Sequence, residues 1–377
     1  MDKKLLLQQL DGGKARDFLE KMYGKDHAEE NKKRYIHVME GFEQSFKKTD
    51  LCLFTSAGRT EISGNHTDHN HGKVLAGSIN LDCVAAAAAN GTDEIRIISE
   101  TYNQKFTIRL DDLTPSEKMA GTIDLTKGML MGFKEMGYRI GGFDAFITSN
   151  VISAAGVSSS ASYEMLICSM INTFFNENQV DVVTYAHVGK YAENKYWNKA
   201  SGLLDQMACA VGGMITIDFK DPLKPVVEKI DYDFGAQDHS LIIVQTGKGH
   251  ADLSAEYSSI PSDMKKVAAV FGKEDFGDGA ASLLEEILRL CSDESKTYYL
   301  GGYSLAGLFS LWASYQTDRF AGIAAASPSV WFPGFLPYMK EHENQSRAVY
   351  LSLGDKEEKT KNPVMATVGD CIREAHA

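Results

Sequence analysis

Three short stretches of the sequence gather side chains that can bind a small polar ligand and carry out chemistry on it. The first runs from Gly58 to Gly72 and contains Arg59, His66 and Asp68. An arginine presents a fixed fork of donors and an aspartate presents a pair of acceptors, so together they can discriminate between the hydroxyl groups of a sugar. We therefore interpret this stretch as a ligand-binding loop.

Two other interpretations of this loop remain open. It can be a solvated surface loop, since polar residues between glycines are common there. It can also hold a metal ion through His66, Asp68, His69 and His71. Three histidines this close together lack the spaced ligands of a typical zinc site, so the metal interpretation is the weaker one.

The second stretch, residues 153–161, is rich in serine and small residues. It follows a strand pattern over residues 143–151 and precedes an apolar segment over residues 163–175. A loop that opens a helix can present backbone N–H groups and the helix dipole to phosphate, and its hydroxyls can reach phosphate or Mg²⁺. The motif of a Walker-type P-loop is absent from the sequence. A serine-rich helix N-cap is the alternative interpretation.

The third group consists of Glu193 and the segment Gly202-Leu203-Leu204-Asp205-Gln206. Apolar residues recur at helical spacing beside Glu193, which places this carboxylate near the end of a helix, facing either solvent or a metal ion. Asp205 precedes an apolar helix predicted over residues 207–211. A buried carboxylate needs a partner, and the candidates are Arg59 and a substrate hydroxyl.

The elements that must position these groups form an α+β pattern. Helices are predicted over residues 16–23 and 34–46, and strands from Leu51 onward and over residues 94–99, 105–110 and 143–151. Residues 74–89 are mostly small and apolar, as expected of a buried segment.

The bulk composition describes a chain of 377 residues that is 44% hydrophobic and has a formal net charge of −12. This length allows two or three compact domains. The negative charge opposes binding to nucleic acid and to anionic membranes, so polymeric anions are poor candidates for partners. Neither a signal peptide nor a membrane span is found, and the six cysteines include no CxxC pair. We therefore expect a cytoplasmic protein; its oligomeric state is left open.

Four blocks lie in order within residues 50–274. They are Gly58-Arg59 followed after six residues by His66-Thr67-Asp68, the loop from Gly156 to Ala161, the segment from Gly202 to Gln206, and Gly249-His250-Ala251-Asp252-Leu253 with Glu256-Tyr257. Together they resemble the galactokinases, which belong to the GHMP kinase superfamily. The resemblance implies an ATP-dependent kinase that phosphorylates the C1 hydroxyl of galactose or a related sugar, with ATP and Mg²⁺ as cofactors.

The resemblance also implies a role for each matching residue. Asp205 would receive or orient the proton of the C1 hydroxyl, and Arg59 would stabilise the developing negative charge. The sugar pocket would contain these two residues and His66, Asp68, Gly202 and Tyr257. The nucleotide phosphates would be wrapped by Gly156, Val157, Ser158, Ser159 and Ser160, and Mg²⁺ would be bound by Ser160 and Glu193.

The sequence departs from the family pattern at five positions. Asn65 stands where the pattern has a glutamate, which removes a charged acceptor and loosens the expected choice of sugar. Glu61 and Ser63 replace the usual asparagine and isoleucine. Ile152 and Ala154 stand where the family favours proline and glycine, and a Cβ at Ala154 is expected to crowd the phosphate and weaken ATP binding.

The sequence after residue 275 changes character. A strand over residues 297–300 runs into Gly-x-Ser-x-Ala around Ser304 and then into an apolar helix, as in the nucleophile elbow of α/β-hydrolases. Residues 321–331 and the strand that ends at Asp355 resemble esterases of that fold. A working triad needs a histidine after the acid, and His376 alone follows, on a predicted helix over residues 368–375. A serine in a structural turn is the alternative interpretation.

The sequence patterns and the two resemblances together imply four segments. They are a helical leader (1–50), a sugar- and ATP-binding domain of the ribosomal protein S5 domain 2-like class (51–220), the start of a GHMP C-terminal domain (221–274) and a partial α/β-hydrolase-like segment (275–377). The second glycine-rich motif expected of a galactokinase is not found after residue 274. The simplest hypothesis is a fusion of two incomplete segments near residues 271–274. The functional alternatives to a sugar kinase are then a serine esterase that uses Ser304 and Asp355, or a non-catalytic fusion product.

Overall fold

The computed structural model describes residues 1–64, 68, 71–117, 121–151, 153, 156–199, 201–232, 280–303, 305–332, 334–353 and 367–376. Several residues named above lie outside this set: Asn65, His66, His69, Ile152, Ala154, Tyr257, Ser304 and Asp355. The chain divides into two compact units, Met1–Gly277 and Asp278–Ala377. Within the described residues, no helix has both the length and the apolar character that a membrane crossing requires.

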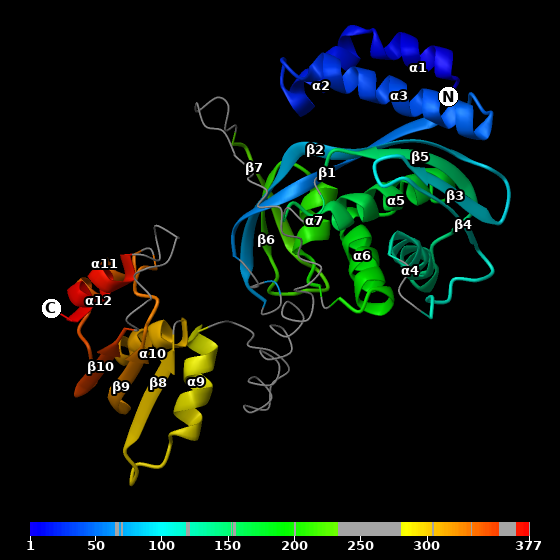
Figure 1. Cartoon of the computed structure of the whole chain (residues 1–377). Helices are drawn as coiled ribbons and strands as arrows, with labels where there is room; N and C mark the ends of the chain where they lie inside the picture. The colour runs from blue at the N-terminus through cyan, green and yellow to red at the C-terminus, as the bar shows by residue number, and fades with distance from the viewer. Residues whose placement is uncertain are drawn as a thin grey trace. The chain divides into compact units, whose positions relative to one another are not determined.

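The first unit is built on a seven-stranded sheet (Figure 1). Its strands are β1 (Cys52–Ser63), β2 (Lys73–Ala89), β3 (Glu94–Ser99), β4 (Gln104–Arg109), β5 (Phe143–Ser149), β6 (Met214–Asp218) and β7 (Val226–Ile230). The spatial order is β4-β3-β5-β2-β6-β7, and β1 pairs with β2. Strands β3 and β5 are parallel, and the other described pairs in this sheet are antiparallel. The predicted strands are confirmed with shifts of one or two residues at their ends.

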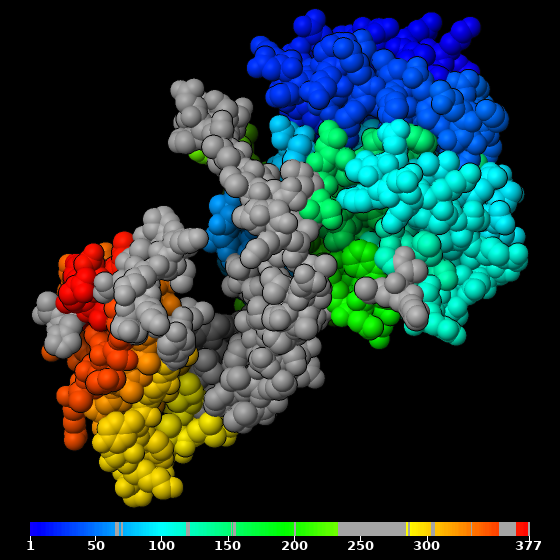
Figure 2. Space-filling model, viewed as in Figure 1, coloured from blue at the N-terminus to red at the C-terminus, as the bar shows by residue number. Residues whose placement is uncertain are grey.

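Helices cover both faces of this sheet. Helices α1 (Lys3–Leu10), α2 (Gly13–Tyr23) and α3 (Ala28–Phe46) lie on one face, where they form a continuous blue layer in Figure 2. Helices α4 (Thr122–Glu135), α5 (Ser159–Phe175), α6 (Val182–Tyr196) and α7 (Leu204–Val211) lie on the other face (Figure 1). The predicted helical leader is thus a packed layer whose helices begin earlier than the sequence pattern indicated.

Strand β2 shows why one sheet can carry two layers of helices. Val84 and Ala86 pack in the core beneath the N-terminal helices, whereas Ala85 and Ala87 pack in the core formed with α4, α5 and α6. Successive side chains of a strand point to opposite faces of the sheet. The run from Asp82 to Ala87 is therefore buried from both sides. The burial predicted for residues 74–89 holds for this run, whereas Asn80 and Ala89 are exposed.

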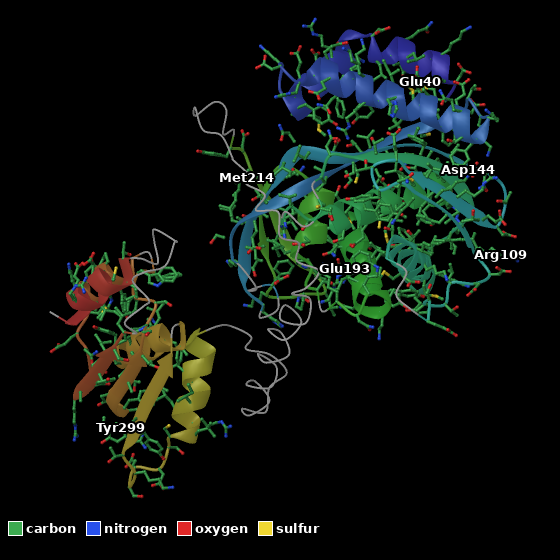
Figure 3. The ribbon with its side chains drawn as sticks, viewed as in Figure 1. Glu40, Arg109, Asp144, Glu193, Met214 and Tyr299 are labelled. Carbon is green, nitrogen blue, oxygen red and sulfur yellow. The ribbon has the colours of Figure 1, made fainter. Side chains whose placement is uncertain are left out.

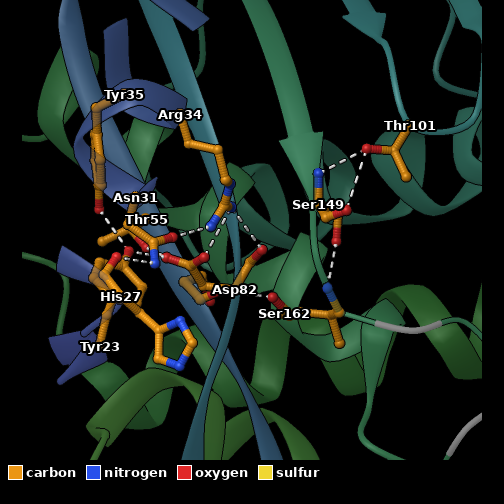
Figure 4. A network of polar contacts seen from close by, with 12 residues as sticks. Tyr23, His27, Asn31, Arg34, Tyr35, Thr55, Asp82, Thr101, Ser149 and Ser162 are labelled. Carbon is orange, nitrogen blue, oxygen red and sulfur yellow. Dashed lines mark hydrogen bonds and ion pairs between the residues drawn. The ribbon is translucent and has the colours of Figure 1, made fainter. Parts of the chain in front are cut away.

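A buried carboxylate joins the N-terminal helices to the sheet (Figure 4). Asp82 on β2 is 1% exposed. Its Oδ2 accepts a hydrogen bond from the Tyr23 hydroxyl at 2.5 Å and another from Thr55, and its Oδ1 lies 2.9 Å from Arg34 Nη2. The Tyr35 hydroxyl lies 3.0 Å from that of Tyr23. One aspartate therefore connects α2 and α3 with β1 and β2.

The second unit contains a three-stranded parallel sheet. Its strands are β8 (Tyr298–Tyr303), β9 (Phe320–Ala326) and β10 (Ala348–Ser352), in the order β10-β9-β8, and its helices are α9 (Ala280–Leu290), α10 (Leu305–Gln316), α11 (Phe335–Glu341) and α12 (Val368–His376). Tyr298 and Leu300 pack into its core, whereas Tyr299 between them is 74% exposed (Figure 3).

The strand and helix predicted around Ser304 are present as β8 and α10. The predicted nucleophile Ser304 and acid Asp355 lie outside the described residues, and so does the side chain of His376 at the end of α12. The esterase hypothesis therefore stays a prediction.

Candidate functional site

An ion pair between Arg59 and Asp205 lies at the centre of the candidate site. Arg59 is on β1 and Asp205 is in the first turn of α7. The arginine Nε and Nη2 donate to Asp205 Oδ1 at 2.9 and 2.6 Å. The arginine side chain is 12% exposed and the aspartate side chain 28%. The partner that the sequence required for a buried aspartate at this position is thus Arg59.

Ser158 provides a third contact to the same carboxylate. Its Oγ donates to Asp205 Oδ2 at 2.6 Å. Ser158 stands at the N-cap position of α5, with φ 55° and ψ 58°, and its side chain makes no capping hydrogen bond. Ser158 is therefore the N-cap residue of α5, as the alternative interpretation expected, but its hydroxyl bonds Asp205 and does not cap the helix. A non-glycine residue in the left-handed region is strained, and such strain is often found at functional sites.

The charge state of Asp205 follows from these contacts. Burial opposes ionisation, but the charges of Arg59 and Lys199 and the hydrogen bonds from Ser158 and Arg59 outweigh it. The pKa of Asp205 therefore lies below its ordinary value. The side chain is a carboxylate at neutral pH, and it can accept a hydrogen bond or a proton from a ligand hydroxyl.

The predicted phosphate loop is held against the same arginine. Arg59 Nη1 donates to the Gly156 carbonyl at 2.6 Å, and the Arg59 backbone N–H donates to the Val157 carbonyl at 3.2 Å. The loop leads into α5, whose first turn contains Ser159 and Ser160 and no acidic residue. The N–H groups of a first helical turn lack partners within the helix and carry partial positive charge, so this end of α5 can receive an anion.

Glu193 lies beside this first turn of α5. Its side chain is 1% exposed, so it is not the solvated carboxylate that the sequence left open (Figure 3). Glu193 Oε1 accepts a hydrogen bond from Ser160 Oγ at 3.1 Å and lies 2.5 Å from Lys199 Nζ. The two residues predicted to bind Mg²⁺ are therefore in contact, and an ammonium group shares the same carboxylate oxygen.

The turn after α6 brings Lys199 back to Glu193. Helix α6 ends at Tyr196, and Asn198 has a left-handed backbone with φ 50°. The backbone N–H groups of Trp197 and Lys199 both donate to the Glu193 carbonyl at 3.1 Å. The chain thus folds over the helix end. Burial opposes the charge of Lys199, but Glu193 and Asp205 raise its pKa above the ordinary value.

A second buried carboxylate, Glu164 on α5, lies behind Glu193. Gln206 Nε2 donates to Glu164 Oε2 at 3.1 Å and to Glu193 Oε2 at 3.3 Å. Glu164 is fully buried, and this burial, together with the negative charge of Glu193, raises its pKa well above the ordinary value. Gln206 therefore joins the carboxylate that pairs with Lys199 to a second carboxylate whose pKa is raised by burial.

Asp68 and Gly202 meet at the other end of the site. Asp68 Oδ2 accepts a hydrogen bond from the Leu204 backbone N–H at 3.4 Å, at the start of α7. A Cβ at Gly202 would overlap the carboxylate of Asp68. Glycine is thus the residue that lets Asp68 approach the helix that carries Asp205.

The structure brings together nine of the residues predicted for the kinase site. They belong to all three chemical stretches of the sequence and are Arg59, Asp68, Gly156, Val157, Ser158, Ser160, Glu193, Gly202 and Asp205. The predicted sugar-binding residues His66 and Tyr257 lie outside the described residues. Across the described part of the chain, no group of three or more His, Cys, Asp or Glu side chains is arranged to hold a metal ion.

Sequence reasoning missed Glu164 and Lys199. Glu164 was detectable as the single charged residue in the apolar segment 163–175. Lys199 carried no such signal, because its contact with Glu193 depends on the left-handed turn at Asn198. Together with the residues above, they make a site that can orient a ligand hydroxyl on Asp205 beside an anion at the start of α5.

Two family models match the chain within its first unit. Residues 40–89 match the galactokinase galactose-binding signature, and residues 124–213 match the N-terminal domain of the GHMP kinases. These ranges contain every residue of the ion pair, the loop and the buried carboxylate cluster.

Curated proteins that are similar in sequence to this chain include galactokinases. The chain is 33% identical to the galactokinase of Pyrococcus furiosus over 219 residues, which are 58% of this chain and 60% of that protein. It is 34% identical to the galactokinase of Clostridium perfringens over 220 residues, or 58% of this chain and 56% of that protein. The chain thus spans less than two-thirds of the length of these relatives.

A solved structure supports the fold. The crystal structure of Lactococcus lactis galactokinase complexed with galactose aligns with a TM-score of 0.54 and 24% sequence identity, covering 69% of this chain and 68% of that one. The first unit therefore has a mixed α+β, GHMP-kinase-like fold, and the N-terminal part of the chain is similar in sequence to galactokinases.

Proposed function

We propose that this chain is an ATP-dependent sugar kinase, similar to galactokinase, that phosphorylates the C1 hydroxyl of galactose or a related sugar. The observation that carries the proposal is the contact of Asp205 with both Arg59 and Ser158. It places an ionised carboxylate next to the loop that opens α5. A proton acceptor and an anion-binding helix end are thus adjacent, as transfer of a phosphoryl group to a hydroxyl requires.

On the sugar side, Asp205 Oδ2 orients the C1 hydroxyl and accepts its proton as the new bond to phosphorus forms. Arg59 keeps Asp205 ionised before the reaction and stabilises the negative charge that develops beside it. Its guanidinium also fixes the Gly156 carbonyl, so the same group aligns the acceptor and the phosphate loop. Alignment of this kind supplies much of the rate of phosphoryl transfer.

On the nucleotide side, the residues from Gly156 to Ser160 and the N-terminus of α5 hold the phosphates. The backbone N–H groups of the first turn point toward the anion, and the helix dipole stabilises its charge. This assignment is consistent with the absence of acidic residues from that turn.

Ser160 and Glu193 fit a Mg²⁺ site in their chemistry. Mg²⁺ favours hard oxygen ligands and commonly binds one or two protein groups together with substrate phosphates. The hydroxyl and carboxylate lie 3.1 Å apart beside the phosphate loop. When bound there, Mg²⁺ would neutralise charge on the phosphate oxygens. Glu193 is held in position by Ser160 and Gln206, and this fixes the carboxylate that the ion would meet.

A panel of sugars tests the proposed activity. With Mg²⁺ and ATP, we expect ADP release that depends on galactose or a related reducing sugar, with the new phosphate on C1 in the NMR spectrum of the product. The matched control is methyl galactoside, whose C1 oxygen is blocked, and it should release no ADP above the background without sugar. ADP release that is independent of sugar, or equal turnover of the methyl glycoside, would contradict the proposal.

Replacing Gly202 by alanine should impair sugar binding more than catalysis. The new Cβ displaces the carboxylate of Asp68, which we assign to the sugar pocket. We expect the KM for the sugar to rise roughly tenfold, because about one good hydrogen bond to the sugar is lost. The change in kcat should be smaller. Steady-state kinetics at saturating ATP measures both constants.

Gly13→Ala is the control for this variant, because a Cβ at Gly13 meets no atom within 4 Å. Its sugar KM should equal that of the wild type. An unchanged KM in the Gly202→Ala protein would remove Asp68 and Gly202 from the proposed sugar pocket.

A further inference from the structure

One oxygen atom of Glu193 has two partners. Oε1 accepts the hydrogen bond of Ser160 at 3.1 Å and the ion-pair contact of Lys199 Nζ at 2.5 Å, while Oε2 accepts from Gln206 at 3.3 Å. This inference rests on the proposed function, in which Ser160 and Glu193 bind the divalent cation. The ammonium group of Lys199 therefore occupies a position that a cation bound to Oε1 of Glu193 would take.

The charges of the site are already balanced by the described residues. Arg59 pairs with Asp205, and Lys199 pairs with Glu193. Glu193 is almost fully buried, so its negative charge needs a nearby positive group even when no metal ion is bound. Lys199 supplies that group.

The two partners differ in their freedom to move. Glu193 is fixed by Ser160 and Gln206 and is 1% exposed, whereas the side chain of Lys199 is 43% exposed. A lysine has a long flexible stem, so its ammonium can leave Glu193 without a change in the backbone of the turn. The positive charge of the same ammonium also contributes to the lowered pKa of Asp205.

We propose that Lys199 is an internal cation of the site, which neutralises Glu193 when no metal is bound and which a divalent ion must displace. Once displaced, the ammonium group pairs with a phosphate oxygen of the nucleotide. The chain thus has a second positive group for phosphoryl transfer, and its affinity for the metal alone is lowered by competition.

Binding of Mn²⁺ alone, measured by electron paramagnetic resonance on the full chain, tests this inference. If Lys199 leaves Glu193 about one-tenth of the time, its removal tightens Mn²⁺ binding about tenfold, because apparent affinity scales with the fraction of competent sites. Lys199→Met should show this gain, and Lys199→Arg, which keeps the charge, should bind like the wild type. If Lys199→Met does not fold, Lys199→Gln removes the charge while keeping a donor to Glu193.

A double variant tests whether the gain in Mn²⁺ affinity acts through Glu193. In the Glu193→Gln background, removal of Lys199 should leave Mn²⁺ binding unchanged, because the shared carboxylate is gone. A second readout is the binding of a fluorescent ATP analogue in EDTA, which Lys199→Met should weaken several-fold.

Equal Mn²⁺ affinity of the wild type and the uncharged variants, or no Mn²⁺ binding by any of them, overturns the inference. So does a gain that persists in the Glu193→Gln background. Failure of the proposed function gives a different result, namely no sugar-dependent ADP release. The difference in Mn²⁺ affinity between the variants would still be measured in that case.

Discussion

Asp205→Asn should lower sugar-dependent ADP release on the order of 10³-fold, within the range that a positioned proton acceptor contributes. The amide keeps the shape of the side chain and can still accept from Arg59, but it has no negative charge and cannot take the hydroxyl proton. The charge of Arg59 is then uncompensated beside the site. The measurement is a coupled assay for ADP at saturating ATP and sugar, with Asp205→Ala as a second variant.

Two controls separate chemistry from folding in this experiment. Asp111→Asn changes an exposed aspartate that pairs with Arg109 far from the site, and it should keep full activity. The Asp205→Asn protein should keep the circular dichroism spectrum of the wild type and its affinity for the ATP analogue. If the activity of the Asp205→Asn protein lies within tenfold of the wild type, Asp205 is not the proton acceptor.

Asp82→Ala should strongly destabilise the first unit. It removes the shared acceptor of Tyr23 and Thr55 and leaves the largely buried guanidinium of Arg34 without its carboxylate. Breaking a buried ion pair on one side costs about 3–5 kcal/mol. For a unit of this size, that corresponds to a fall of roughly 10 °C in the Tm of its transition, at about 2–4 °C per kcal/mol. Calorimetry of the full chain resolves this transition.

Two milder substitutions provide a comparison for the loss of stability expected of Asp82→Ala. Tyr23→Phe removes one hydrogen bond of the network and should lower stability by about 1 kcal/mol. Asp111→Ala changes an exposed carboxylate and should leave the Tm unchanged. If Asp82→Ala melts within 2 °C of the wild type, the network does not hold the N-terminal helices to the sheet in the way we infer.

The sequence was informative where local pattern determines structure. The patterns of β3, β4 and β5 predicted their positions to within one or two residues. In β3 and β4 the alternation reflects burial of one side of the strand, whereas β5 is buried along nearly all of its length. The need of Asp205 for a partner predicted contact with Arg59 or with a substrate hydroxyl, because an isolated buried charge is too costly, and the structure shows Arg59 in that place. Both arguments rest on burial, which can be read from residue type.

The remaining features of the site depend on tertiary structure. The hydroxyl of Ser158 satisfies a distant carboxylate instead of its own helix end, and residue type does not distinguish these two uses. The contact of Lys199 with Glu193 follows from a left-handed residue that is not glycine, a conformation that sequence patterns seldom reveal. The start of α3 at Ala28 was missed because its first residues are charged and only one face of the helix is buried.

The network around Asp82 also bears on how β2 is aligned with its neighbours. Residues 85–89 are all alanine, so within this stretch a slip of the strand by one or two residues would mostly replace one alanine by another. Strand register is weakly specified when the pattern of side-chain size does not change with a slip. Asp82 lies just before the alanines, and its bonds to Tyr23, Thr55 and Arg34 form in a single alignment. This aspartate therefore fixes which alanine opposes which partner across the central sheet.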